Sequence, residues 1–319
     1  MTRYIVRRLI ALIPVLFVVS VIVFLMIHLI PGDAATAYAG MDATLEQVEA
    51  VREKMGLNEP LYIQYWLWLY RIFQGDLGNS IVSRLPVWKL IMLRLPATVE
   101  LTISAMIMAV LFSIPAGVIA ALHNRKLADK MISVVTSIGL AVPEYWSGLL
   151  AIIIFAVYLH LLPPGGRVEP SEGIILWLKS LLLPAITLGY PIGCMQARFL
   201  RASMIEVMHE QYILFARGKG LKPRVIVLTH ALRNSLIPLM TVIGIQLGRM
   251  MGGAILVESV YNWPGVGRMV VQSIIQRDYA IVQAVVLLIV IVFSMLSLAT
   301  DILYHVIDPR INLIDQTSR

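Results

Sequence analysis

Charged side chains are scarce in this sequence. Asp, Glu, Lys and Arg make up 14% of its 319 residues, against about 25% in soluble globular domains. Hydrophobic residues make up 59%, and the mean hydropathy is +0.82. This composition excludes an ordinary soluble domain and is typical of an integral membrane protein. In a membrane protein, the net charge of +7 is informative about the side of the bilayer on which Lys and Arg lie. No nucleic-acid partner is expected.

Cysteine is almost absent, and the histidines do not cluster. Cys194 is the one cysteine and lies in an apolar segment, so the chain can form neither a disulfide framework nor a thiolate metal site of its own. The six histidines are scattered along the chain without the spacing of metal ligands. No metal site and no bound cofactor are expected in this chain.

Catalytic motifs are also missing. The run Arg217-Gly-Lys-Gly220 lacks the upstream glycine and the hydroxyl residue of a phosphate-binding loop, so the chain cannot hydrolyse ATP by that route. No Ser, His and Asp residues come together at a defensible spacing, and no catalytic residue is predicted. An enzyme is therefore the weaker interpretation.

Long apolar runs are abundant. About 20 helical residues cross the ~30 Å hydrocarbon core of a bilayer, and six segments have that character: 9–30, 99–122, 131–162, 176–196, 236–257 and 280–304. The third is too long for one straight crossing, and Pro143 is expected to kink it or to divide it. The predicted fold class is an all-α integral membrane protein with six transmembrane helices.

The first apolar segment could also be a cleaved signal peptide, since Arg3, Arg7 and Arg8 precede it and Ala37-Tyr-Ala39 resembles a cleavage site. Signal peptides have apolar regions of about 7–15 residues. Segment 9–30 is longer, which favours a retained membrane anchor.

The distribution of Lys and Arg predicts the orientation of the chain. With the N-terminus inside, segments 1–8, 123–130, 198–233 and 305–319 carry 15 basic and 5 acidic residues, and the outside segments carry 9 and 12. Basic residues accumulate on the cytoplasmic side of membrane proteins. We therefore expect a cytoplasmic N-terminus at 1–8, a cytoplasmic tail at 305–319 and an extracytoplasmic region at 31–98.

The extracytoplasmic region contains two patterned stretches. Residues 44–54 are typical of a surface helix, with Thr44 as N-cap and Gln47 three residues later. Residues 60–73 are rich in Tyr and Trp, which suits a membrane–water interface.

Ionisable residues inside apolar spans are costly and usually face a bundle interior or a water path. Arg249 lies near the middle of the fifth span. It is expected to pair with Asp301 or Glu144 or to reach water in a pore; contact with a substrate carboxylate is the alternative. Glu144 follows Pro143 and suits a helix start, where the dipole favours an acid.

The loop between the fourth and fifth spans, residues 198–235, is basic and long. It combines bases with the apolar run Tyr212-Ile-Leu-Phe215. Residues 206–215 have helical composition, Gly218 and Gly220 are expected to break the helix, and Pro223 is expected to start another. An ordinary positive-inside loop that binds lipid headgroups is one interpretation, and an exposed apolar docking site for a protein is the other.

Several motifs resemble one family of membrane proteins. The loop sequence 212–221, followed by His230-Ala-Leu-Arg-Asn-Ser-Leu-Ile-Pro238, is similar to the glycine-containing cytoplasmic loop of permease subunits of ATP-binding cassette (ABC) importers. The resemblance is to the first permease of the dipeptide, oligopeptide and nickel subfamily. Further matching stretches lie in order along the chain at 4–9, 31–33, 75–80, 162–166, 257–268 and 308–311.

This resemblance implies a type I ABC importer permease fold in the inner (plasma) membrane of a prokaryote. It implies four kinds of partner besides the lipid bilayer: a second permease, two cytoplasmic ATPases that bind ATP and Mg²⁺, and an external solute-binding protein. The loop would transmit ATPase movement to the spans, and its coupling residues would be Glu210, Gln211, Tyr212, Phe215, Ala216, Arg217, Gly218, Lys219, Gly220 and Leu221.

The resemblance also implies a cargo of di- or oligopeptides, with nickel complexes, glutathione and oligosaccharides as alternatives. Arg249 and Glu144 are the candidates for lining the substrate path. Two other classes stay open on the residues alone: an ion-coupled secondary transporter and a structural membrane subunit.

Overall fold

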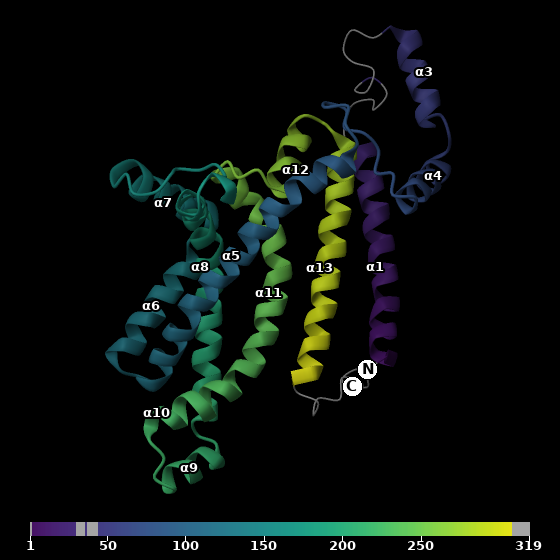
Figure 1. The fold of residues 1–319 in the computed structure, drawn as a ribbon. Helices are drawn as coiled ribbons and strands as arrows, with labels where there is room; N and C mark the ends of the chain where they lie inside the picture. The colour runs from purple at the N-terminus through teal and green to yellow at the C-terminus, as the bar shows by residue number, and fades with distance from the viewer. Residues whose placement is uncertain (1, 30–35, 37–43, 308–319) are drawn as a thin grey trace. The chain divides into compact units, whose positions relative to one another are not determined.

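The computed structural model describes residues 2–29, 36 and 44–307. These residues fold into helices, and within them the only strand-like pairing is a single bridge between Asn79 and Pro86. Figure 1 labels most of the elements, which in chain order are α1 Thr2–Leu29, α3 Leu45–Met55, α4 Leu61–Phe73, α5 Val87–Leu122, α6 Leu127–Ala141, α7 Glu144–Ala151, the π-helix η1 Ile152–Tyr158, the 3-10 helix η2 Pro170–Glu172, α8 Ile174–Val207, α9 Gln211–Gly218, α10 Pro223–Val225, the π-helix η3 Ile226–Leu232, α11 Arg233–Val260, α12 Val266–Ile275 and α13 Tyr279–Ile307.

Five helices in the described part of the chain are long and apolar enough to cross a membrane: α1, α5, α8, the α10–α11 run and α13. A sixth span exists if α6 is joined to the α7–η1 segment, which meets it at an angle of 105°. The break lies at Val142 and Pro143, because a proline ring clashes with the preceding helical turn. The described residues thus offer five or six spans, and the predicted interruption at Pro143 is confirmed.

Several helices are longer than the apolar segments that predicted them. α5 begins at Val87, twelve residues before the predicted span at 99, and α8 continues to Val207, beyond the predicted end at 196. Hydropathy detects only the stretch that is apolar, whereas the backbone hydrogen bonds continue into the polar ends.

The chain divides into two compact units. The first comprises residues 1–96 and 268–292. Within it, Thr44 caps α3 through the backbone N–H of Gln47, and the Gln47 side chain accepts from the Thr44 N–H, so the predicted capping box is confirmed. The Ser80 hydroxyl donates to the buried carboxylate of Asp278 at 2.5 Å.

The second unit comprises residues 97–267 and 293–319. Its main core is formed by buried side chains of α5, α8 and α11 with Tyr261 and Trp263. A Cβ at Gly189 of α8 would lie 2.3 Å from the backbone oxygen of Ala105 in α5, so only glycine permits this approach of the two helices. Glycines also allow α13 to approach α11, because Gly244 and Gly248 of α11 face Thr300 and Phe293 of α13.

Candidate functional site

The candidate site is built on α9, the short helix in the basic loop. Glu210 precedes the helix with an extended backbone, and Lys219 and Gly220 close it. The Gly220 N–H donates to the Arg217 carbonyl at 2.9 Å, and Gly220 has φ +76°. A left-handed residue after a helix ends it at little cost only when it is glycine. Pro223 then starts α10, as predicted.

Gly218 does not have the role expected from the sequence. It is the last residue of α9, and its φ lies outside the left-handed region that Gly220 occupies. An added Cβ there would meet no atom within 4 Å. The turn is thus made by Gly220 alone, while Gly218 leaves an open notch on the helix surface.

One face of α9 is buried in its own unit. Ile213 is 0% exposed and Ala216 is also buried. Both pack in a cluster that joins the C-terminal end of α8 to η3 and the start of α11, with Leu200, Met204, Ile226, Val227, Ala231 and Leu239 as its other buried members. Ala216, one of the predicted coupling residues, therefore places its methyl group inside this cluster, and its contact with a partner stays a prediction.

The opposite face of α9 is apolar and exposed. Leu214 is 57% exposed and Phe215 is 66% exposed, and the Gly218 notch lies on the same face because 214 and 218 are one helical turn apart. The Lys219 ammonium lies 4.7 Å from the centre of the Phe215 ring, a cation–π geometry. Gln211, Arg217 and Leu221 are also exposed. Leu214 was not among the predicted coupling residues.

Tyr212 connects α9 to α11. The side-chain amide of Asn234 donates to the phenol oxygen of Tyr212 at 2.6 Å. Asn234 lies in the first turn of α11, the long helix of the fifth span. The sequence did not indicate this pair, because the partners are separated by 22 positions that include the glycine turn and η3.

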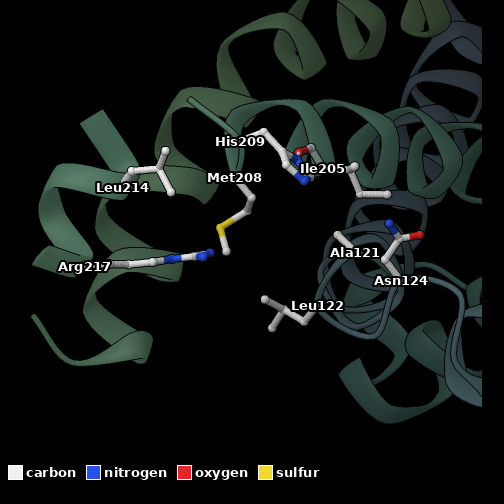
Figure 2. Close-up of a pocket in the computed structure, with 8 residues that line it drawn as sticks. All are labelled: Ala121, Leu122, Asn124, Ile205, Met208, His209, Leu214 and Arg217. Carbon is white, nitrogen blue, oxygen red and sulfur yellow. Dashed lines mark hydrogen bonds between the residues drawn. The ribbon is translucent and has the colours of Figure 1, made fainter. Parts of the chain in front are cut away.

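A cavity of about 350 Å³ lies beside α9. Figure 2 shows Leu214 and Arg217 of α9 on one side of it and the end of α5 on the other, with Met208 projecting between them. The lining combines apolar side chains with three polar ones, and its members are Ala121, Leu122, Asn124, Ile205, Met208, His209, Leu214 and Arg217. The cavity is therefore amphipathic, with a guanidinium at its edge.

A buried ion pair fixes one wall of this cavity. Asp129 is 4% exposed and accepts from Arg201 through both carboxylate oxygens, at 2.5 and 2.7 Å. It also accepts from the backbone N–H of Arg125 at 2.8 Å. Arg201 in turn donates to the side-chain oxygen of Asn124 at 3.2 Å. The bidentate pair joins α6 to α8 and holds Asn124 at the cavity.

The two predicted residues of the substrate path lie elsewhere in the same unit. The Glu144 carboxylate, at the start of α7, is 3.6 Å from the position of a Cβ on Gly253 of α11. Arg249, one turn earlier on α11, is exposed, and the part of its surroundings that the structure describes provides no ion pair for it. The expected partner Asp301 lies in α13, but its side chain falls outside the described residues.

No cluster of three or more His, Cys, Asp or Glu residues that could hold a metal ion occurs among residues 2–29, 36 and 44–307. Around α9, the described residues instead combine exposed apolar side chains with bases.

Comparison with protein families gives two matches. The model described as "Binding-protein-dependent transport system inner membrane component" matches residues 113–313. The model described as "Binding-prot-dependent transport system membrane comp, N-term" matches residues 1–102. Together they match most of both compact units.

Similar proteins of known name were also found. The chain is 42% identical over 311 residues to the glutathione transport system permease protein GsiC of Escherichia coli (strain K12), which covers 98% of this chain and 99% of the relative. GsiC of Shigella flexneri serotype 5b is similar to the same extent. A solved inward-facing structure of the MetNI methionine ABC transporter matches with a TM-score of 0.57 and 16% identity, over 69% of this chain and 97% of that chain. This last likeness concerns the fold.

Proposed function

Because the chain belongs to the family of binding-protein-dependent transport system inner membrane components, we propose that α9 is the helix through which a partner ATPase moves it. The protein is a multi-pass inner-membrane permease subunit of an ABC importer and is not itself catalytic. An ion-coupled secondary transporter and a purely structural subunit, both left open by the residues alone, are set aside by this membership.

The observation that carries the proposal is the division of α9 into two faces. Ile213 and Ala216 anchor the helix in the core, while Leu214 and Phe215 expose apolar surface beside two bases. A helix that is well anchored has no need of an exposed Leu–Phe pair for its own stability. Such a face fits a groove in a partner protein, with acidic residues placed to meet Arg217 and Lys219.

The structure supports a route for the movement. A displacement of α9 acts on α11 through the Asn234–Tyr212 hydrogen bond and on α8 through the buried cluster. Because packed helices move as rigid bodies and do not deform continuously, a push on α9 would tilt α8 and α11 together. The spans would then alternate between inward-open and outward-open arrangements.

The partners follow from the same proposal. We infer a second permease, two cytoplasmic ATPases that bind ATP and Mg²⁺, and an external solute-binding protein. The N-terminus, α9 and the C-terminal tail would face the cytoplasm, in agreement with the excess of Lys and Arg in those segments.

For the cargo we infer short peptides, including glutathione. The relatives at 42% identity are named as glutathione permeases, and glutathione is a tripeptide-like molecule with carboxylates and an amine. Arg249 and Glu144 offer charges of both signs toward such a molecule, and both belong to the second unit. Nickel complexes and oligosaccharides are the other candidates. Measuring ATPase stimulation of the reconstituted complex by the binding protein loaded with glutathione, dipeptides or nickel would separate them.

The coupling proposal is tested by a matched pair of substitutions. Leu214 on α9 and Leu228 on η3 are 57% and 59% exposed, so serine at either position removes the same exposed apolar surface. Leu214→Ser should lower co-purification of the ATPase and uptake by the assembled complex, whereas Leu228→Ser should leave both near the wild-type value. Equal effects of the two variants would refute the docking role of α9.

A further inference from the structure

The helix α4 in the first unit has three distinct faces. Tyr65, Trp68 and Ile72 lie on a face with little exposure. A second face carries Gln64 and Arg71. The third consists of four large side chains at spacings of four, four and three residues, each more than half exposed: Tyr62, Trp66, Tyr70 and Phe73. At 3.6 residues per turn, this aromatic stripe falls within an arc of about 80°.

The buried face of α4 rests on α1. The Tyr65 ring meets Phe24 edge-on with the centroids 5.4 Å apart, and Trp68 lies 5.7 Å from the same Phe24 ring. The Tyr65 hydroxyl is 2.8 Å from the Ser20 hydroxyl. Because Ser20 already donates to the carbonyl of Phe17, Tyr65 is the donor in this pair.

The contact with Ser20 fixes the depth of α4. The apolar run of α1 extends at least from Leu9 to Met26, so Ser20 lies six or more residues inside its C-terminal end. At 1.5 Å per residue this is a depth of at least about 9 Å along the axis, inside the ~30 Å hydrocarbon core. Figure 1 shows α4 beside the half of α1 that is remote from the N-terminus. Because the Tyr65 side chain contacts α1 at this depth, α4 lies inside a lipid leaflet and not on its surface.

The polar groups of α4 are compatible with that depth. The Gln64 amide donates to the carbonyls of Leu57 and Glu59, at 3.1 and 2.7 Å, so the preceding turn satisfies it. Arg71 is in the last turn and can extend its long side chain toward the headgroups. Tyr and Trp side chains favour the region between hydrocarbon and headgroup.

We propose that α4 is a helix inserted in one leaflet, and that its aromatic stripe contacts the phospholipids of the leaflet crossed by the C-terminal half of α1. In the orientation proposed above, this is the outer leaflet. At 13 residues, α4 is too short to cross the bilayer, so it stays within that leaflet. The inference concerns a lipid contact and is independent of the coupling role of α9.

The test measures what reaches the stripe in the assembled importer, reconstituted in vesicles of phosphatidylethanolamine and phosphatidylglycerol. In a Cys194→Ala background, a nitroxide is attached at Tyr62→Cys, Trp66→Cys or Tyr70→Cys, and at Glu46→Cys on the polar helix α3 as the control. Collisions with oxygen, which dissolves in lipid, and with a water-soluble nickel chelate are compared. Oxygen should dominate at the three stripe positions and the nickel chelate at Glu46.

Two results would overturn the proposal. If the nickel chelate collides with the stripe positions as often as with Glu46, the aromatic stripe faces water and not lipid. Protection from both agents would show that a second membrane subunit covers it. If the cysteine variants fold poorly, the milder Trp66→Phe variant serves: it should reduce the fraction of tryptophan emission that dibrominated lipids quench, and an unchanged fraction contradicts lipid contact.

Discussion

The side-chain amide of Asn234 donates a hydrogen bond to the phenol oxygen of Tyr212, at 2.6 Å. The bond joins the first turn of α9 to the first turn of α11, and it is a direct polar link between the proposed docking helix and a membrane span. A hydrogen bond of this kind contributes about 0.5–1.5 kcal/mol, enough to bias a two-state movement without being needed for folding.

Removing the Tyr212 hydroxyl should therefore weaken the coupling between α9 and α11 without unfolding either helix. Tyr212→Phe is expected to lower uptake a few-fold, while the ATPase still co-purifies, because Leu214 and Phe215 remain in place. Tyr190→Phe is the control, since the Tyr190 hydroxyl donates to the carbonyl of Val135, at 3.1 Å and away from α9. The quantity to measure is uptake per ATP hydrolysed. An unchanged ratio in Tyr212→Phe would show that the hydrogen bond takes no part in transmitting the movement.

Gly218 and Gly220 should respond differently to the same change. Gly218→Ala meets no atom within 4 Å and removes the cost of a helical glycine, so stability should stay equal or rise by about 0.5–1 kcal/mol. Gly220→Ala puts a Cβ on a residue with φ +76° and should cost about 1–2 kcal/mol. Thermal unfolding of the two variants in detergent gives the comparison.

A larger side chain at the first of these positions tests the partner rather than the permease. Gly218→Leu should leave the unfolding temperature close to that of Gly218→Ala but should reduce ATPase co-purification, because it fills the notch between the exposed side chains of α9. Normal assembly and uptake by Gly218→Leu would mean that nothing docks there.

The Asp129–Arg201 pair should contribute strongly to stability. Removing one member of a buried pair leaves the other charge uncompensated and costs about 3–5 kcal/mol; because the Arg201 side chain is 30% exposed, the lower end of that range is expected for Asp129→Ala. Glu49→Ala is the matched control, since Glu49 pairs with Arg52 at 3.6 Å on the surface of α3 with a side chain 64% exposed, and such pairs contribute about 0–1 kcal/mol. Similar losses of unfolding free energy in Asp129→Ala and Glu49→Ala would show that the Asp129–Arg201 pair does not have this structural role.

The approach of α5 to α8 can be probed at a single backbone atom. Gly189→Ala would place a Cβ 2.3 Å from the oxygen of Ala105, whereas Gly252→Ala meets open space. Because the obstructing atom belongs to a helix backbone, it cannot rotate away, and overpacking of this kind costs about 1–3 kcal/mol. We expect a lower unfolding temperature for Gly189→Ala only. Equal unfolding temperatures would show that the two helices separate freely.

Much of this architecture could be predicted because it is local. Apolar length defined the spans, Thr44 and Gln47 defined the start of α3, and Pro143 defined the break in the third span. Each of these signals depends on residues within one or two helical turns of one another. The family resemblance, carried by ordered motifs, located the loop that contains α9.

The faces of α9 could not be predicted in the same way. Ile213 and Leu214 are both apolar neighbours, and only the packing of α8 and η3 decides that the first is buried and the second exposed. The resemblance gave Ala216 a coupling role without showing that its side chain is buried, and turn composition made Gly218 a helix breaker although its φ lies outside the left-handed region. Asn234 escaped notice because its partner is brought near by the fold and not by sequence spacing.

The hydroxyl pair of Ser20 and Tyr65 also constrains how the protein is made. Insertion machinery recognises spans by length, and the 13 residues of α4 fall short of the ~20 that it retains. The place of α4 is provided instead by α1, which leaves the ribosome first. Synthesis up to Phe73 is thus the earliest moment at which α4 can settle, and at that moment none of the later spans has yet been made.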